Sequence, residues 1–302
     1  MNIATINLNK AFEEYNAIAP KKVLQLDNGV FEYRYFNNPN PQYDITIITL
    51  AGGSGMADSL FLMSSELSKK YHFATFNYPL DYPDNKGLAY AISCLIRHEN
   101  MKNVYLLGQS YGGLIAQIVA KEYPDLIKGL ILSSTCSLSN DLTFNGVARM
   151  YQMISEEKEK KNKKLSKTLP SWALRTFMKF AFKKHIPDKE TRDNITEILT
   201  ILKKDLNGTY MSHMDGLLGD LRNHYGTHTK SDFEKYDGEV LIIEPDDDLT
   251  FTPDMKKALF KLMTNPEIKT DFDGGHLALL LNSDKYLAIV EQFLAHRNPS
   301  LK

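Results

Sequence analysis

Apolar and polar positions along the chain change their spacing repeatedly, and this rhythm predicts the elements of the fold. The run at 45–50 is apolar at almost every position, as in a strand buried on both faces, whereas 60–70 has apolar residues at helical spacing. The alternation continues to residue 134 and resumes after residue 236. We therefore predict strands at 44–50, 73–78, 104–107, 129–134, 239–243 and 267–272, and helices at 60–70, 87–98, 114–122, 253–263 and 284–296.

The alternation of strands and helices predicts a parallel sheet, because each strand is followed by a crossover that returns the chain to the same sheet. Two earlier segments, 22–27 and 30–36, are separated by Asn28-Gly29, a dipeptide typical of a two-residue hairpin turn. The sequence therefore predicts an α/β fold with a mostly parallel central sheet that is preceded by an antiparallel hairpin.

Between residues 137 and 235 the strand rhythm stops and the chain reads as helices. We expect a helical insert at 137–235 that interrupts one core, whose two parts are 1–136 and 236–302. Within the insert an apolar stripe recurs at near-helical spacing, which indicates packing onto the main domain or, as the alternative, the lining of a pocket. Its members are Trp172, Leu174, Phe177, Met178, Ala181 and Phe182.

Charge is distributed unevenly in this insert. Residues 156–184 carry ten Lys and Arg residues against three Glu residues, whereas the whole chain has a formal net charge of -1. A solvated helix face is the ordinary explanation. The alternative is reversible docking on an anionic membrane surface, because basic residues flank an aromatic face.

The composition is that of a globular chain. With 302 residues, 43% of them hydrophobic, the chain can build one large core plus a small inserted domain. Balanced charge argues against a nucleic-acid binder, and no window approaches the roughly 18 apolar residues of a membrane span. The first 20 residues lack the hydrophobic centre of a secretory signal, so we expect a cytoplasmic chain. Cys94 and Cys136 have no metal-type spacing, which indicates buried thiols rather than a metal site.

A serine lies where the predicted strand 104–107 gives way to the predicted helix 114–122, in the string Gly108-Gln109-Ser110-Tyr111-Gly112-Gly113. Small residues at 108 and 112 let the chain reverse within about two residues around a strained central residue, whose hydroxyl then projects clear of the sheet. This context makes Ser110 a candidate nucleophile. A structural glycine-rich turn with an idle serine is the alternative.

Serine is a weak nucleophile, so it needs a base, a carboxylate that orients the base, and donors for the developing oxyanion. Asp247 and Asp248 follow the predicted strand 239–243, and His276 follows the predicted strand 267–272 behind Gly274-Gly275. Loops at the carboxyl ends of parallel strands share one sheet edge, so these side chains and the serine turn lie on the same side. A solvated or helix-capping aspartate loop and a loop histidine without a task are the alternatives.

The order serine, acid, histidine is that of the α/β-hydrolase arrangement, and the chain resembles this superfamily from the Asn28-Gly29 hairpin to its last helix. The resemblance implies a serine hydrolase with Ser110, Asp248 and His276 as its triad and a helical cap in the place of the insert. In that family the acid often follows a Gly-x-x-Asp pattern. Counted from Pro245, which stands in the glycine's place, the pattern selects Asp248 and leaves Asp247 as the second choice.

The resemblance also implies an oxyanion hole formed by the backbone N–H groups of Gly53 and Tyr111. Gly53 belongs to the loop Leu50-Ala51-Gly52-Gly53-Ser54-Gly55-Met56, in which many relatives have a histidine where this chain has Ala51. A phosphate-binding loop is the rival interpretation, but no Lys-Ser or Lys-Thr follows it and no third glycine has dinucleotide-binding spacing. We therefore expect no cofactor.

The predicted activity is cleavage of a carboxylic ester, thioester or amide of a small to medium apolar substrate. A serine disfavours the haloalkane dehalogenase and epoxide hydrolase reactions of the superfamily, but leaves acyl transfer, carbon-carbon hydrolysis, peptidase and lyase reactions open. Residues 54–61 and 77–79 also resemble the maspardin branch, regarded as interaction proteins because a member lacks a complete triad; here the triad positions are filled. A lipid hydrolase on anionic membranes is a third interpretation, and the sequence does not indicate an oligomeric state.

Overall fold

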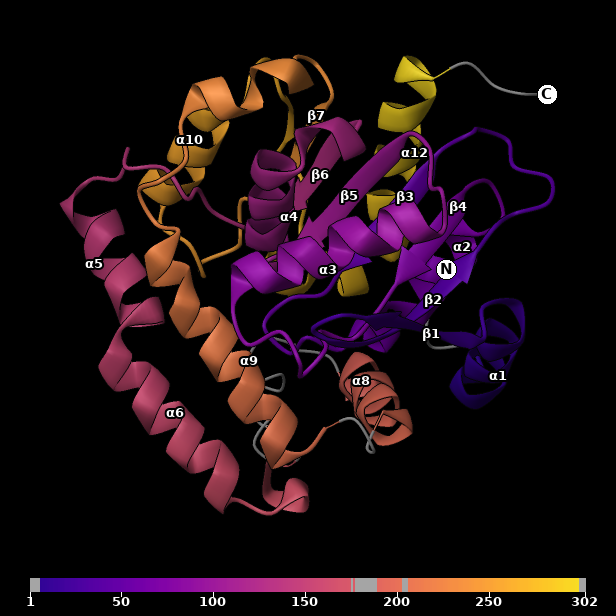
Figure 1. Cartoon of the computed structure of the whole chain (residues 1–302), viewed down its shortest axis with the longest axis horizontal. Coiled ribbons are helices and arrows are strands. Elements are labelled where there is room, and N and C mark those ends of the chain that lie inside the picture. Colours follow the sequence, from indigo (N-terminus) through magenta and orange to yellow (C-terminus); the bar gives the residue numbers. More distant parts are fainter. Residues whose placement is uncertain (1–5, 175, 177–188, 203–205, 299–302) are drawn as a thin grey trace.

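An eight-stranded sheet forms the centre of the molecule (Figure 1). The structure is a computed structural model that describes residues 6–174, 176, 189–202 and 206–298. In these residues the strand order is β1-β2-β4-β3-β5-β6-β7-β8, with β1, β2 and β4 paired antiparallel and the other pairs parallel. The strands are β1 (Lys21–Leu26), β2 (Gly29–Phe36), β3 (Thr46–Leu50), β4 (His72–Thr75), β5 (Val104–Gln109), β6 (Gly129–Ser133), β7 (Val240–Ile243) and β8 (Glu267–Lys269).

Helices cover both faces of the sheet, as the continuously apolar strands require. On one face α3 (Asn85–His98), α4 (Tyr111–Glu122) and α10 (Pro253–Leu262) pack against residues such as Ile48, Leu106 and Ile242. On the other face α2 (Phe61–Leu67) and α12 (Ser283–Arg297) pack against Ile47, Leu107 and Leu241. Successive strand residues point to opposite faces of the sheet. Since helices cover both faces, the central strands are buried along their whole length. The predicted α/β sheet with its antiparallel hairpin is confirmed.

The hairpin turn lies one residue earlier than the predicted Asn28-Gly29. Leu26 pairs with Gly29, so the turn residues are Asp27 and Asn28. A side chain at Gly29 would overlap Asp81, whose carboxylate accepts a hydrogen bond from the Val30 N–H at 2.8 Å. Gly29 is therefore needed for this close approach within the strand rather than for the turn.

Several other elements differ from the prediction: the strand predicted at 73–78 ends at Thr75, and the helix predicted at 60–70 ends at Leu67. The helix α1 (Leu8–Ile18) was not expected from the sequence; Asn7 caps it, and Tyr15 packs fully buried beside the ion pair of Arg34 and Asp58, whose closest atoms are 2.8 Å apart. The last strand, β8, ends at residue 269 instead of 272, because a hydrogen bond from the Phe272 N–H to the Thr270 carbonyl bends the chain.

The elements described between β6 and β7 form a helical insertion, apart from one bridge between Ser139 and His228. Helices α6 and α9 lie side by side, and α5 continues into α6 at the edge of the molecule (Figure 1). Of the predicted apolar stripe, Trp172 is exposed and Leu174 buried, whereas Phe177, Met178, Ala181 and Phe182 lie outside the described residues. The helices are α5 (Phe144–Ile154), α6 (Glu156–Thr168), α8 (Lys189–Ile201) and α9 (Gly208–Asp220).

The remaining described helices are short, and they are η2 (Ala57–Leu60), η3 (Pro124–Leu126), η4 (Leu221–Asn223), η5 (Lys230–Tyr236), η6 (Gly275–Leu277) and α11 (Ala278–Leu281). Two of them, η6 and α11, follow the loop after β8 and lead the chain into α12. Of the helices in the described ranges, none has the length and apolar character that crossing a bilayer requires.

Candidate active site

Ser110 occupies a one-residue turn between β5 and α4, with φ 54° and ψ -119°. This conformation is strained for a residue other than glycine. Two flanking glycines make the turn possible: a Cβ at Gly108 would overlap the Gly112 carbonyl, and a Cβ at Gly112 would overlap the Leu50 carbonyl. The Ser110 N–H donates to the Ser133 carbonyl at 2.9 Å, so the turn is also tied to the neighbouring strand.

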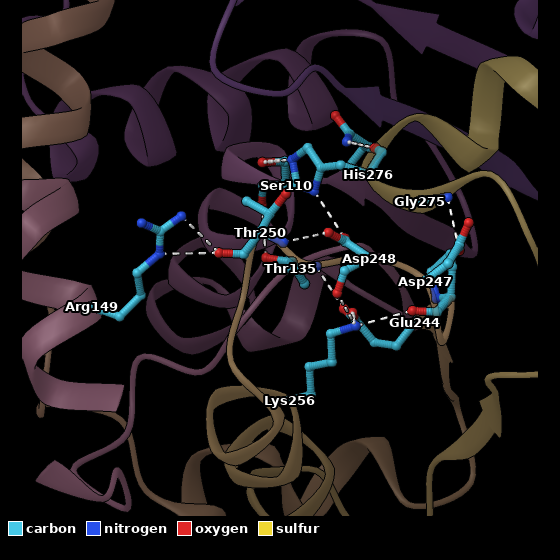
Figure 2. A network of polar contacts seen from close by, with 12 residues as sticks. Ser110, Thr135, Arg149, Glu244, Asp247, Asp248, Thr250, Lys256, Gly275 and His276 are labelled. Atoms are coloured by element: carbon cyan, nitrogen blue, oxygen red, sulfur yellow. Dashed lines mark hydrogen bonds and ion pairs between the residues drawn. The ribbon is translucent and has the colours of Figure 1, made fainter. Parts of the chain in front are cut away.

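Ser110 and His276 lie within hydrogen-bond distance, with 2.9 Å between Oγ and Nε2 (Figure 2). The other ring nitrogen of His276, Nδ1, lies 2.9 Å from Asp248 Oδ2. The ring packs edge-on against Phe251, and the Gln109 side chain donates to the His276 carbonyl at 3.0 Å. Three loops far apart in the sequence thus bring a serine, a histidine and a carboxylate into one hydrogen-bonded line.

Asp248 is buried and its second oxygen, Oδ1, accepts a hydrogen bond from the Thr250 N–H at 2.8 Å. Burial raises the pKa of the Asp248 carboxyl. The hydrogen bond and the charge of His276, and the hydrogen bonds from Thr250, outweigh this effect and lower the pKa to about 2. The carboxylate is therefore ionised at neutral pH. It can hold a proton on Nδ1 of His276 and leave the lone pair of Nε2 directed at the serine hydroxyl.

Asp247 has a different place. Its carboxylate is exposed, and its two oxygens accept the N–H groups of Gly274 at 3.0 Å and Gly275 at 2.9 Å (Figure 2). Both glycines have positive φ, 117° and 54°, so the loop before His276 needs residues without a side chain. The Asp247 carboxylate fixes this loop by accepting both backbone N–H groups. The structure therefore places Asp248 beside the imidazole and Asp247 against the backbone that leads to it.

The loop after β3 lies beside the serine turn. A Cβ at Gly52 would overlap the side chain of Gln109, and Gly53 lines the same cavity as Ser110 and His276. Tyr111 is the first residue of α4, and the first N–H groups of a helix have no acceptor within the helix. The two amides predicted to form an oxyanion hole thus belong to the two segments that flank the Ser110 hydroxyl.

Sequence reasoning missed the polar groups that hold this loop. Tyr78 donates from its hydroxyl to the Ala51 carbonyl at 2.6 Å, and the Tyr210 hydroxyl of α9 donates to the Gly55 carbonyl at 2.8 Å. The Asn85 side chain accepts from the Tyr111 hydroxyl at 2.5 Å and donates to the Leu217 carbonyl of α9 at 3.0 Å. Tyr78, Asn85 and Tyr210 belong to none of the catalytic strings, so no spacing in the sequence indicates their role.

A cavity of about 200 Å³ opens beside Ser110 and His276. One wall comes from the helical insertion, since Ile195, Ile198 and Leu199 share a face of α8 at helical spacing. The opposite walls are the loop after β3 and the segment that follows His276. Apolar side chains dominate the lining, and they include Met56, Leu60, Leu279 and Leu280.

Comparisons with known proteins agree with the fold. A model of the alpha/beta hydrolase fold family matches residues 36–283, most of the chain. The chain belongs to the α/β hydrolase fold family. Solved structures that resemble this chain include an esterase from Exiguobacterium antarcticum, with a TM-score of 0.62, 15% identity and coverage of 90% of this chain and 98% of that one. An alpha/beta hydrolase enzyme from a Medee basin deep-sea metagenome library has a TM-score of 0.65, 16% identity and coverage of 90% and 96%.

Matches to curated proteins cover only part of each relative. Phytyl ester synthase 1, chloroplastic, of Arabidopsis thaliana is 25% identical over 306 residues, which are 94% of this chain and 42% of that protein. Proline iminopeptidase of Lactobacillus helveticus is 30% identical over 127 residues, which are 37% of this chain and 43% of that protein. The chain thus spans less than half the length of the curated relatives it matches. Members of the family are mostly esterases, lipases and peptidases.

Of the basic stretch 156–184, residues 156–168 form the helix α6, whereas Arg175, Lys179, Lys183 and Lys184 lie outside the described residues. Lys160 pairs with Glu156 at 3.2 Å and Lys163 with Glu159 at 2.5 Å, so part of the positive charge is neutralised within the helix. The preceding helix α5 exposes two aromatic side chains one above the other: Phe144 is 86% exposed and Tyr151 59% exposed. Two consecutive helices of the insertion thus expose aromatic side chains (α5) and basic side chains (α6).

Proposed function

We propose that this α/β hydrolase is a serine hydrolase that cleaves a carboxylic ester, thioester or amide through an acyl-enzyme on Ser110. The observation that carries the proposal is the line of two 2.9 Å contacts from the Ser110 hydroxyl through His276 to Asp248. A binding protein of the maspardin type has no need of a strained serine, a buried carboxylate and an imidazole aligned in this way.

The proposed reaction follows from these positions. Ser110 Oγ attacks the carbonyl carbon while His276 Nε2 takes its proton, and Asp248 stabilises the imidazolium through Nδ1–H. The tetrahedral oxyanion accepts the N–H groups of Gly53 and Tyr111. Collapse breaks the bond to the leaving group, which takes the proton from Nε2. Water then attacks the acyl-enzyme with His276 as base, which releases the acid and returns the proton to Ser110.

The cavity supports an apolar acyl or leaving group of small to medium size. Its walls beside Ser110 are mainly aliphatic, and transfer of apolar substrate surface from water to such walls is favourable by about 25 cal/mol per Å². In this proposal residues 137–235 act as the cap of the site, because α8 supplies one wall and α9 holds the loop with Gly53.

Intact-mass spectrometry after treatment with a reactive fluorophosphonate tests this function, with the wild type, Ser110→Ala and His276→Ala compared. We expect one adduct per wild-type chain and none in either variant, because only an activated serine displaces fluoride at a useful rate. Circular dichroism verifies that the variants are folded. If folded wild type forms no adduct, or if Ser110→Ala still forms one, the proposed nucleophile is wrong.

A lipid hydrolase that docks on anionic membranes is the second candidate, favoured by the exposed Phe144 and Tyr151 of α5 and the lysines of the next helix, α6. Sedimentation with vesicles of phosphatidylcholine, with and without phosphatidylserine, tests it. Binding that needs phosphatidylserine and disappears at about 1 M salt supports docking, because salt at that concentration screens exposed charges beyond about 3 Å. If the protein does not bind at low salt, the basic face is only solvated.

A further inference from the structure

Two ionisable side chains lie below the candidate triad and take no part in the proposed reaction. Glu244, the residue after β7, is completely buried, and Lys256 reaches it from α10 (Figure 2). Glu244 Oε1 accepts the Thr135 N–H at 2.6 Å, and Oε2 lies 3.7 Å from Lys256 Nζ. A buried carboxyl at a strand end is costly, since an apolar side chain would fill the same space without losing hydration.

The first contact of Glu244 leads to the nucleophile. Thr135 follows the end of β6, where Ser134 adopts a positive φ of 44° and turns the chain under the serine turn. The Thr135 hydroxyl donates to the Ser110 carbonyl at 2.7 Å. Thr135 therefore binds Ser110 through its side chain and Glu244 through its backbone.

The second contact leads to the acid. Lys256 Nζ donates to the Pro245 carbonyl at 3.0 Å and to the Asp248 carbonyl at 2.9 Å. The ammonium thus closes the short loop that presents the Asp248 carboxylate to His276. Together, the contacts of Thr135, Glu244 and Lys256 form one largely buried polar path from the backbone of Ser110 to the backbone of Asp248.

We propose that Glu244, with Lys256 as its partner, is a positioning residue that fixes the Asp248 loop relative to the Ser110 turn. The inference rests on the proposed function for its consequence in turnover, but the alignment itself exists without substrate. Burial raises the pKa of the Glu244 carboxyl to about 8, against the opposing effects of Thr135 and Lys256. A group held at this cost is retained for its contacts, because packing alone does not require a carboxyl.

Four substitutions separate alignment from packing. Glu244→Gln keeps an oxygen for the Thr135 N–H, whereas Glu244→Leu removes it at similar volume. Lys256→Met removes the ammonium and Lys256→Arg restores a donor. The exposed neighbour Lys257 provides the matched control, Lys257→Met.

The first readout is hydrolysis of p-nitrophenyl butyrate together with the rate of fluorophosphonate labelling. We expect Glu244→Leu to lower kcat and the labelling rate about tenfold or more with KM within about twofold, because misplacement of reacting groups by a fraction of an ångström affects the transition state. We expect Glu244→Gln to retain most of the wild-type kcat and labelling rate. Both rates should be higher in Lys256→Arg than in Lys256→Met, and Lys257→Met should have the wild-type rates. Folded Glu244→Leu and Lys256→Met variants with wild-type kcat and labelling rates would overturn the proposal.

The second readout needs no turnover. In protein with ¹⁵N-labelled histidine, the Nδ1–H proton of His276 gives a downfield resonance when it is hydrogen-bonded to Asp248, and His276→Ala identifies that resonance. We expect Lys256→Met to broaden or shift the resonance and Lys257→Met to leave it unchanged. An unchanged resonance in Lys256→Met and Glu244→Leu refutes the positioning role. If the fluorophosphonate does not label the wild type but the His276 resonance changes in Lys256→Met, the positioning role is supported and the proposed hydrolysis is wrong.

Discussion

Replacing Asp248 by asparagine changes one atom of the buried group and tests which aspartate orients the histidine. The asparagine keeps an oxygen for the Thr250 N–H, but its NH2 group then faces His276 Nδ1, which lies 2.9 Å from Oδ2 in the wild type. Nδ1 must become an acceptor, so the ring proton moves to Nε2, and the imidazole can no longer take the proton of Ser110. We expect kcat to fall by about 10⁴-fold, the effect of the corresponding change in a serine protease triad.

The same substitution has a second effect, on stability, whose size follows from the pKa. The folded protein lowers the pKa of Asp248 from 3.8 to about 2, and each unit corresponds to about 1.4 kcal/mol. The pKa is depressed in the folded state, so the stabilisation is present above pH 4 and lost as the pH falls through 2. Over this range the wild type should lose about 2 kcal/mol of unfolding free energy that Asp248→Asn does not lose, measured by urea unfolding followed by circular dichroism.

Asp247→Asn is the matched control, because it makes the same chemical change one residue away. The amide oxygen can still accept one of the two N–H groups of Gly274 and Gly275, and the site is exposed. We expect a loss in kcat of no more than about tenfold, the worth of roughly one hydrogen bond. Hydrolysis of p-nitrophenyl butyrate by both variants is the assay. Equal and mild losses would show that Asp248 is not the acid and would refute the reasoning from tautomers.

Two further predictions concern the turn and the cavity. Gly112→Ala should prevent the serine turn from forming, because its Cβ would overlap the Leu50 carbonyl. We expect this variant to lack a folded circular dichroism spectrum and to form no fluorophosphonate adduct by intact mass. The control Gly216→Ala, whose Cβ meets only the end of the Lys163 side chain, should fold and be labelled. Ile198→Trp should fill the cavity and lower kcat/KM for p-nitrophenyl octanoate more than for the acetate. Equal effects on both esters would mean that α8 does not contact the acyl chain.

Much of the fold could be predicted because its signals are local. Apolar runs mark the buried strands, and helical spacing marks α3 and α10 within a few residues of their observed ends. The loop positions of Ser110, Asp248 and His276 also follow from local strings, since parallel strands bring their carboxyl ends to one edge. That these residues are catalytic stays a prediction.

Other features depend on contacts between segments far apart in the chain, which leave no periodic signal. Glu244 contacts Thr135, more than 100 residues away, and Tyr210 contacts Gly55 across 155 residues. The first helix, α1, is stabilised by the burial of Tyr15 against Asp58 and Arg34, and its own pattern of mixed polar and apolar residues gave no clear helix. The shift of the hairpin turn has the same origin, because Asp81 determines where Gly29 must lie.

The attachment of α9 has a consequence for how such proteins can diversify. The Asn85 side chain, which is buried in the core, accepts a hydrogen bond from the Tyr111 hydroxyl and donates one to the Leu217 carbonyl of α9. The Asn85 backbone N–H donates to the Asp220 carboxylate of α9 at 2.8 Å. An insertion that placed no acceptors opposite Asn85 would leave a buried amide unpaired next to the serine turn. An exchanged insertion would therefore have to supply such acceptors or be accompanied by a change at Asn85, whereas point substitutions on α8 leave these contacts in place, so new substrate preferences should arise more readily there.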